Sequence, residues 1–296
     1  MTVITRIRFT LIAMLFASVG LLTACGGGGG GGTTTTPAVT VDPVATAARG
    51  FYQGNGTIQG GSGDITIASP NIKGIVDEKG FVFTYKGNDE NGNAIVLFYK
   101  GTFTEVTATS FKAEVRVYVD GVYQETATIS DGVIDAGVSF SGTLVGGGNY
   151  ASSNGAISLS YALDNQTAPP TYLTTSSNKW SDIVGTTGTG QIIFNSTTNF
   201  DAIIALDGVP NNLDACDLLK VNTTNVANEQ TGRIRKFSAD TTGCAGQSND
   251  GQSVTGYFTN FETTNPDDRL YIVVSNDNYA YTGILSCAAA SGNCLQ

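Results

Sequence analysis

The chain has 296 residues, of which 38 are glycine and only 14% are charged, and its net charge at pH 7 is −10. Phosphate would repel such an acidic chain, which argues against nucleic acid as a partner. Histidine is absent, which excludes Ser-His-Asp and Cys-His nucleophile systems and histidine-ligated zinc, copper, iron and haem sites.

Residues 1–24 are predicted to be an export signal. Arg6 and Arg8 precede an almost wholly apolar run over residues 9–22, which is too short for a standard spanning helix and is typical of a secretory signal. The run ends in Leu22-Thr23-Ala24-Cys25, which resembles the lipobox of bacterial lipoproteins. That resemblance implies cleavage before Cys25 and lipid on its thiol and new amino group, and two or more acyl chains hold a protein firmly on a membrane. The alternative is an ordinary signal peptide with an incidental cysteine.

Residues 25–48 are predicted to be a flexible, disordered tether. The seven glycines from Gly26 to Gly32 have no side chains to pack, and the threonine- and proline-containing stretch behind them has no hydrophobic period. A flexible chain of this length spans about 25 Å on average, so the folded part would stand clear of the lipid. In lipoproteins an Asp after the lipidated cysteine commonly signals inner-membrane retention. Gly26 stands there instead, so the resemblance favours the outer membrane, with either face possible.

Residues 49–165 are predicted to form a first β domain. Residues 80–87 place Phe81 and Phe83 on one face and Val82 on the other, and residues 111–119 alternate most clearly of all. A two-residue hairpin turn is expected at Asp120-Gly121, followed by a return strand over residues 122–129. Further turns are expected at Asn91-Gly92, Asp131-Gly132 and Asn154-Gly155.

Residues 166–171 contain two prolines in a polar run and are predicted to be a linker. Alternating segments resume over residues 172–296, the predicted second β domain. The two halves share an order of segments that suggests a weak internal duplication, although any two antiparallel meanders look alike. The prediction is an all-β chain of two tandem small antiparallel β-barrels, or else sandwiches, because closure removes exposed strand edges. This layout broadly resembles that of bacterial surface lipoproteins with small barrel domains. The resemblance does not identify any functional residue in this chain.

Four cysteines remain besides Cys25, an even number that implies two disulfides in an exported protein. Three pairings are possible, and we favour Cys216 with Cys244 and Cys287 with Cys294. The first would join neighbouring strands and the second would close a small terminal loop. The close pairs of thiolates that a zinc site needs are absent from the sequence.

Three groups of residues are weighed as sites. Aromatic residues could form a binding surface, with core packing as the alternative: Trp180, Tyr257, Phe261, Tyr271, Tyr279 and Tyr281. Oxygen-bearing side chains at alternate positions are a weak candidate for a hard cation, with a hairpin turn as the better interpretation: Asp89, Asn91 and Asn93. Acidic residues could supply a pair for glycoside hydrolysis, with plain acidic turns as the alternative: Asp267, Asp268 and Asp277.

The sequence therefore predicts a non-catalytic lipoprotein of the outer membrane, held there by lipid on Cys25. It would bind a protein or a small ligand, with no cofactor and no metal. One alternative is a structural or assembly-assisting lipoprotein that faces the periplasm. A weaker alternative is a hydrolase that uses paired carboxylates.

Overall fold

The structure is a computed structural model that describes residues 48–148, 151–162, 179–182, 191–194, 200–205, 215–225, 234–242, 251–262 and 269–287. After residue 162, side chains are described only at residues 218, 234–242, 251–259 and 269–285. The predicted signal, the lipidation site Cys25, residues 25–47 of the predicted tether and the linker lie outside the described residues. Ala48, the last residue assigned to the tether, is instead buried in the core of the first barrel.

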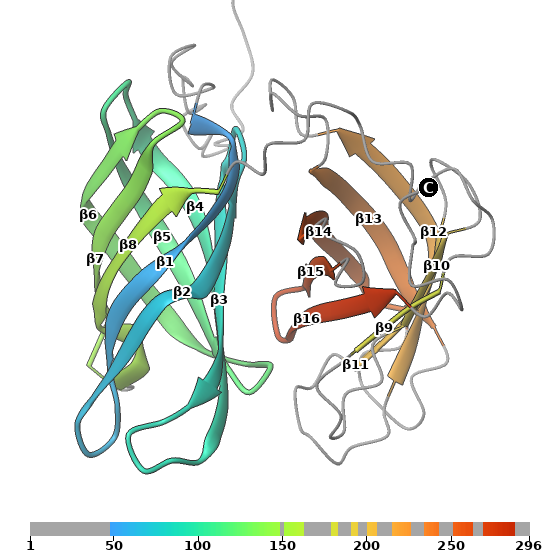
Figure 1. The fold of residues 1–296 in the computed structure, drawn as a ribbon, viewed down its shortest axis with the longest axis horizontal. Coiled ribbons are helices and arrows are strands. Elements are labelled where there is room, and N and C mark those ends of the chain that lie inside the picture. The colour runs from blue at the N-terminus through green and yellow to red at the C-terminus, as the bar shows by residue number, and fades with distance from the viewer. Residues whose placement is uncertain are drawn as a thin grey trace, which may run out of the picture. The chain divides into compact units, whose positions relative to one another are not determined.

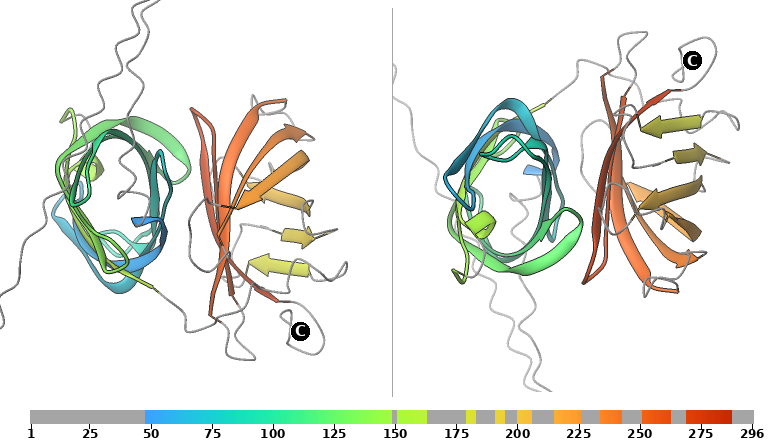
Figure 2. Two further views of the ribbon diagram at one scale, coloured as in Figure 1. Left: turned by 90° about the horizontal axis from the view of Figure 1, so that it is seen from above. Right: turned by 90° about the horizontal axis from the view of Figure 1, so that it is seen from below.

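The first sheet is a closed antiparallel barrel of eight strands (Figures 1 and 2). Its strands are β1 (Gly50–Gln59), β2 (Asp64–Val76), β3 (Gly80–Asn88), β4 (Ala94–Val106), β5 (Ser110–Val119), β6 (Val122–Asp135), β7 (Ser139–Val145) and β8 (Gly155–Tyr161). Each strand pairs with the next one in sequence, and β8 pairs with β1. The predicted antiparallel barrel is thus confirmed for the first half, and the sandwich is wrong for it, because the pairing leaves no strand edge open.

The interior of this barrel is filled with side chains. On β5, Phe111, Ala113, Val115 and Val117 are buried while Lys112 is exposed, which confirms the predicted alternation. Aromatic rings from different strands stack inside, with centroids 4.4 Å apart for Phe111–Phe140 and 4.7 Å for Phe83–Tyr99. The interior is therefore a packed core, as in other small barrels in which side chains fill the lumen.

Two predicted turns are confirmed by their backbone angles. Asp120 and Gly121 have φ of 48° and 84° and connect β5 to β6, as a two-residue hairpin turn requires. Gly92, in the loop between β3 and β4, also has φ of 84°.

The turn predicted at Asp131-Gly132 is wrong, because both residues lie within β6, which continues to Asp135. The pairing of β6 shifts register there, between Ile129 and Val133 against β7. A Cβ at Gly132 would lie 2.4 Å from the Phe111 ring. Gly132 therefore lies in a bulge of β6 where it leaves room for the Phe111 ring, and it does not reverse the chain. Asn154 lies between a 3₁₀ turn (Ala151–Ser153) and the start of β8.

The second sheet also has eight antiparallel strands. They are β9 (Lys179–Asp182), β10 (Gln191–Phe194), β11 (Phe200–Ala205), β12 (Ala215–Asn225), β13 (Arg235–Thr242), β14 (Ser253–Glu262), β15 (Arg269–Ser275) and β16 (Ala280–Cys287). They pair in sequence order, and β16 pairs with β9, so this pairing closes as well. The two sets of strands lie on either side of the predicted linker, while the internal duplication stays a prediction. Among the described residues no helix is long and apolar enough to cross a membrane.

Two strands are buried on both faces. All residues from Gly80 to Thr84 of β3 are buried, as are those from Leu270 to Ser275 of β15. A barrel strand ordinarily turns alternate side chains to solvent. The outer face of β3 is covered by the second sheet, and the outer face of β15 is covered by the first sheet.

Candidate functional site

An apolar cluster joins the outer faces of the two sheets. The first sheet contributes Phe51, Ile75, Val82, Phe98 and Tyr118, and the second contributes Ile234, Tyr271, Val273 and Ala280. The rings of Phe51 and Tyr271 have centroids 5.6 Å apart. Their burial removes from water the apolar surface that each sheet would otherwise expose, which favours association of the sheets.

Backbone pairing between two hairpins extends this contact. The turn after β5 and the turn between β15 and β16 form an isolated antiparallel bridge at Val122 and Tyr279. The amide of Ala280 donates to the carbonyl of Gly121 at 2.8 Å, and the amide of Tyr123 donates to that of Asn278 at 2.8 Å. These bonds are independent of side-chain identity, so they fix the register of one hairpin on the other.

Asp77 is the buried acid of the contact. It opens the connection between β2 and β3, and its Oδ1 accepts hydrogen bonds from the amides of Lys79 at 2.8 Å and Gly80 at 3.0 Å. A Cβ on Gly80 would lie 2.0 Å from the carbonyl oxygen of Gly101 on β4, so only glycine fits at this close approach. The tight turn therefore aims the Asp77 carboxylate out of the first sheet.

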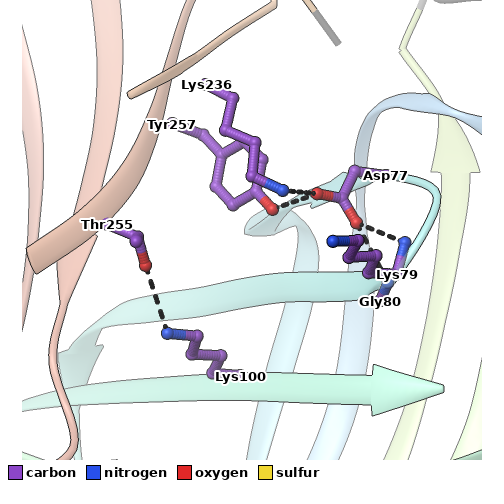
Figure 3. A network of polar contacts seen from close by, with 7 residues as sticks. All are labelled: Asp77, Lys79, Gly80, Lys100, Lys236, Thr255 and Tyr257. Carbon is purple, nitrogen blue, oxygen red and sulfur yellow. Dashed lines mark hydrogen bonds and ion pairs between the residues drawn. The ribbon is translucent and has the colours of Figure 1, made fainter. Parts of the chain in front are cut away.

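The second sheet supplies the remaining partners of this carboxylate (Figure 3). Lys236 on β13 places its Nζ 2.7 Å from Asp77 Oδ2, and the hydroxyl of Tyr257 on β14 donates to the same oxygen. The Asp77 side chain is only 2% exposed and the Lys236 side chain 31%. A buried carboxylate is tolerated when its acceptor sites are filled, and here four donors fill them.

A cavity of about 240 Å³ lies beside this network. Phe98, Val82 and Val273 contribute apolar wall, and Lys100 from β4 lines it together with Thr255 from β14. Lys100 Nζ donates to Thr255 Oγ1 at 3.3 Å (Figure 3). A mostly apolar hollow with a few converging polar groups is the usual form of a small-molecule site.

The surroundings shift two titratable groups at the cavity. Burial, reinforced by the charge of Asp77, raises the pKa of the Tyr257 phenol, so this hydroxyl stays a donor at neutral pH. Loss of water contact lowers the pKa of the Lys100 ammonium. The charge of Asp277, and to a smaller extent that of Asp77, opposes this shift, whereas the charges of Arg116 and Lys236 add to it. Keeping the Lys100 ammonium charged therefore costs more free energy at this site than in water.

The predicted aromatic surface is divided by the structure. Tyr271 is buried between the sheets and its hydroxyl lies 2.8 Å from Thr84 Oγ1, while Tyr257 lines the cavity. Tyr281 is buried and Tyr279 is half-buried in the hairpin contact. Trp180 lies on β9 and Phe261 on β14, and their side chains lie outside the described part of the chain. Tyr257, Tyr271 and Tyr279 thus serve the contact between the sheets, whereas Tyr281 alternates on β16 with Ala280 and Thr282, which face the first sheet. The role of an external binding surface stays a prediction.

The weak cation candidate is a self-capped turn. Asp89 Oδ1 accepts from the amides of Asn91 at 2.9 Å and Asn93 at 2.7 Å, and Asp89 Oδ2 accepts from the Asn93 side-chain amide at 3.0 Å. These bonds occupy the oxygens that a cation would need, in agreement with the hairpin alternative. Among the described residues no group of three or more Cys, Asp or Glu side chains is placed to hold a metal ion.

The proposed carboxylate pair is not brought together within the described residues. Asp277 is exposed in the turn between β15 and β16, and Asp267 and Asp268 lie outside the description. The hydrolase alternative therefore gains no support from them.

The cysteines are placed only by their backbone. Cys216 lies on β12 and Cys287 ends β16, whereas Cys244 and Cys294 fall outside the described residues. Asp217 pairs with Thr242 across β12 and β13, so Cys216 adjoins this pair and Cys244 follows it closely in sequence. The pairing of Cys216 with Cys244 stays a prediction.

Sequence reasoning missed Asp77, Lys100 and Lys236. Lys100 follows the apolar run over residues 95–99, where a charged side chain on a strand flanked by aromatics could have been noticed. Asp77 and Lys236 carry no such signal, because an acid in a turn and a lysine near a strand start are ordinary surface features. Their partnership depends on how the two sheets meet.

Comparisons with known proteins give little beyond this geometry. No protein-family model and no curated protein matches the chain. A solved structure from Bacteroides fragilis NCTC 9343, described as a "putative outer membrane protein", is 12% identical, with 82% of this chain and 98% of that chain covered and a TM-score of 0.21. A score this low carries no argument about fold or function.

Proposed function

We propose that this chain is a non-catalytic, lipid-anchored binding protein of the bacterial cell envelope, with the outer membrane as its site. The observation that carries the binding role is the cavity between the two sheets, with its apolar walls and its few polar groups. The filled interior of the first barrel excludes its lumen as a ligand chamber, so a small ligand is assigned to the cavity between the sheets.

The anchor is supported by the sequence pattern that ends in Cys25 and by the glycine tether behind it. Lipid at the cysteine and a flexible spacer would leave the two sheets free to meet a diffusing ligand. Two tandem closed barrels, the first established above, would form the rigid body that frames the cavity.

Two measurements test this proposal. Mass spectrometry of the mature protein should find acyl groups on Cys25, and Cys25→Ser should move the protein from the membrane fraction to soluble fractions. Unchanged membrane retention would refute the anchor. Small aromatic probes, the anion benzoate and the neutral benzamide among them, should bind the purified chain, and protection of residues at the cavity from hydrogen exchange should locate them. Absence of binding by every probe would remove the binding role.

A further inference from the structure

The wall of the cavity carries an excess of positive charge in an acidic chain. Its charged members are Lys79, Lys100 and Lys236 against the single acid Asp77, whereas the whole chain has a net charge of −10. Lys236 and Asp77 neutralise each other at 2.7 Å. The cavity wall therefore keeps a net positive charge, although the chain as a whole is acidic.

Lys100 has no direct ion-pair partner among the described residues, although the more distant carboxylates of Asp277 and Asp77 act on it. Its neighbour in register on β3 is Val82, and its neighbour on β5 is Arg116. Like charges directly opposite on paired strands are destabilising. Among the described residues Lys100 makes one hydrogen bond, to the neutral Thr255, and no ion pair with a carboxylate.

Arg116 does not relieve this charge. Its guanidinium donates to the backbone carbonyl of Asp277 and to the hydroxyl of Tyr118, and it lies 4.2 Å from the centre of the Tyr123 ring. All three partners are neutral groups. Two adjacent cations thus stand at the edge of the contact without a direct ion pair to a carboxylate among the described residues, and only the more distant charge of Asp277 acts on both, although desolvated cations are normally paired.

We propose that the cavity between the sheets binds a small organic carboxylate, with the anionic group on Lys100 Nζ and the apolar body against Phe98, Val82 and Val273. This deepens the proposed function and rests on it. A ligand carboxylate would supply the missing counter-ion and take hydrogen bonds from an ammonium group that already points at the cavity wall of the second sheet. The volume of about 240 Å³ is below the roughly 300–1,000 Å³ of pockets for drug-sized ligands, so the ligand is small.

The test compares two probes of nearly equal shape on the full chain. Benzoate and its neutral amide, benzamide, are titrated by ligand-observed NMR. Benzoate should bind at least tenfold more tightly than benzamide, and Lys100→Met should remove this advantage. Lys112→Met is the matched control, because Lys112 lies on β5 in an exposed ion pair with Glu105, away from the cavity. It should leave both affinities unchanged.

Each outcome decides something. Equal binding of benzoate and benzamide, or a Lys100→Met variant that keeps the preference for benzoate, would overturn the charge assignment and leave a binding cavity in place. Failure of both probes would overturn the proposed binding role together with this inference. If Lys100→Met does not fold, acylation of lysines in the unaltered protein serves instead. Benzoate, but not benzamide, should slow modification of Lys100 at least threefold, and equal rates would refute the proposal.

Discussion

The carboxylate of Asp77, in the turn after β2, forms an ion pair at 2.7 Å with Lys236 on β13, and this bond joins two separately paired sheets. The same oxygen accepts a hydrogen bond from Tyr257. Asp77 is almost completely buried, and two of its four hydrogen-bond donors come from the other half of the chain. A residue that looks like an ordinary turn acid in the sequence thereby becomes a structural link.

Asp77→Asn should therefore destabilise the protein by about 2–3 kcal/mol. The single oxygen of Asn cannot accept both from the turn amides and from Lys236 and Tyr257, and Lys236 loses its ion-pair partner. Urea unfolding at pH 7 measures this change. Asp64→Asn is a suitable control, because Asp64 is exposed at the start of β2. A loss no larger than that of the control would contradict the assigned role of Asp77.

Lys100→Met should have the opposite effect in the absence of ligand. It removes a partly desolvated cation that faces Arg116, so the free energy of unfolding should rise by about 1 kcal/mol. A gain in stability together with a loss of benzoate binding is the usual pattern for a residue kept for function. Thermal unfolding of the variant beside Lys112→Met provides the measurement, and a lower melting temperature would count against this account.

Gly80→Ala should cost about 2–3 kcal/mol, because its Cβ would lie 2.0 Å from the backbone oxygen of Gly101, which cannot move aside as a flexible side chain can. Gly63→Ala is the matched control, since a Cβ there meets nothing within 4 Å. Equal unfolding midpoints in urea for the two variants would show that the backbone relaxes at Gly80.

Stability should fall as the pH rises above about 10. Burial raises the pKa of Tyr271 and of Tyr257, whereas tyrosines of the unfolded chain ionise near pH 10. Above that pH the folded state holds more protons than the unfolded state, so the free energy of unfolding declines with pH. Tyr271→Phe removes one of these groups, and its decline between pH 9 and 11 should be shallower than that of the unaltered protein. Identical slopes would refute the contribution of Tyr271.

Peptide mapping of the oxidised protein should find Cys216 linked to Cys244 and Cys287 linked to Cys294. Loss of the first bond in Cys216→Ser should cost about 3 kcal/mol, as for other disulfides that close loops of this size. Four free thiols in the denatured, oxidised protein would show that the prediction is wrong.

The sequence predicted the strands of the first half well, because an alternating pattern such as that of Phe111 to Val117 reports directly which side chains face the core. It failed where burial comes from the other sheet. The alternation over residues 111–119 places Tyr118 on the face opposite to Phe111 and Val117, yet Tyr118 is fully buried and its hydroxyl donates to the carbonyl of Asn276 at 2.8 Å. Val82, which the sequence places on the face opposite to Phe81 and Phe83, is likewise buried, in the cluster that joins the two sheets. Contacts between residues more than 150 positions apart leave no local period, so the cavity and its lysines could not be read from the sequence.

The dependence of Asp77 on Lys236 also bears on how such a chain can evolve. If either half were fused to an unrelated partner, it would carry an unpaired charged residue, Asp77 or Lys236. It would also expose apolar side chains such as Phe98 in the first half or Tyr271 in the second. We therefore expect the two halves to be inherited as one unit and not exchanged by recombination.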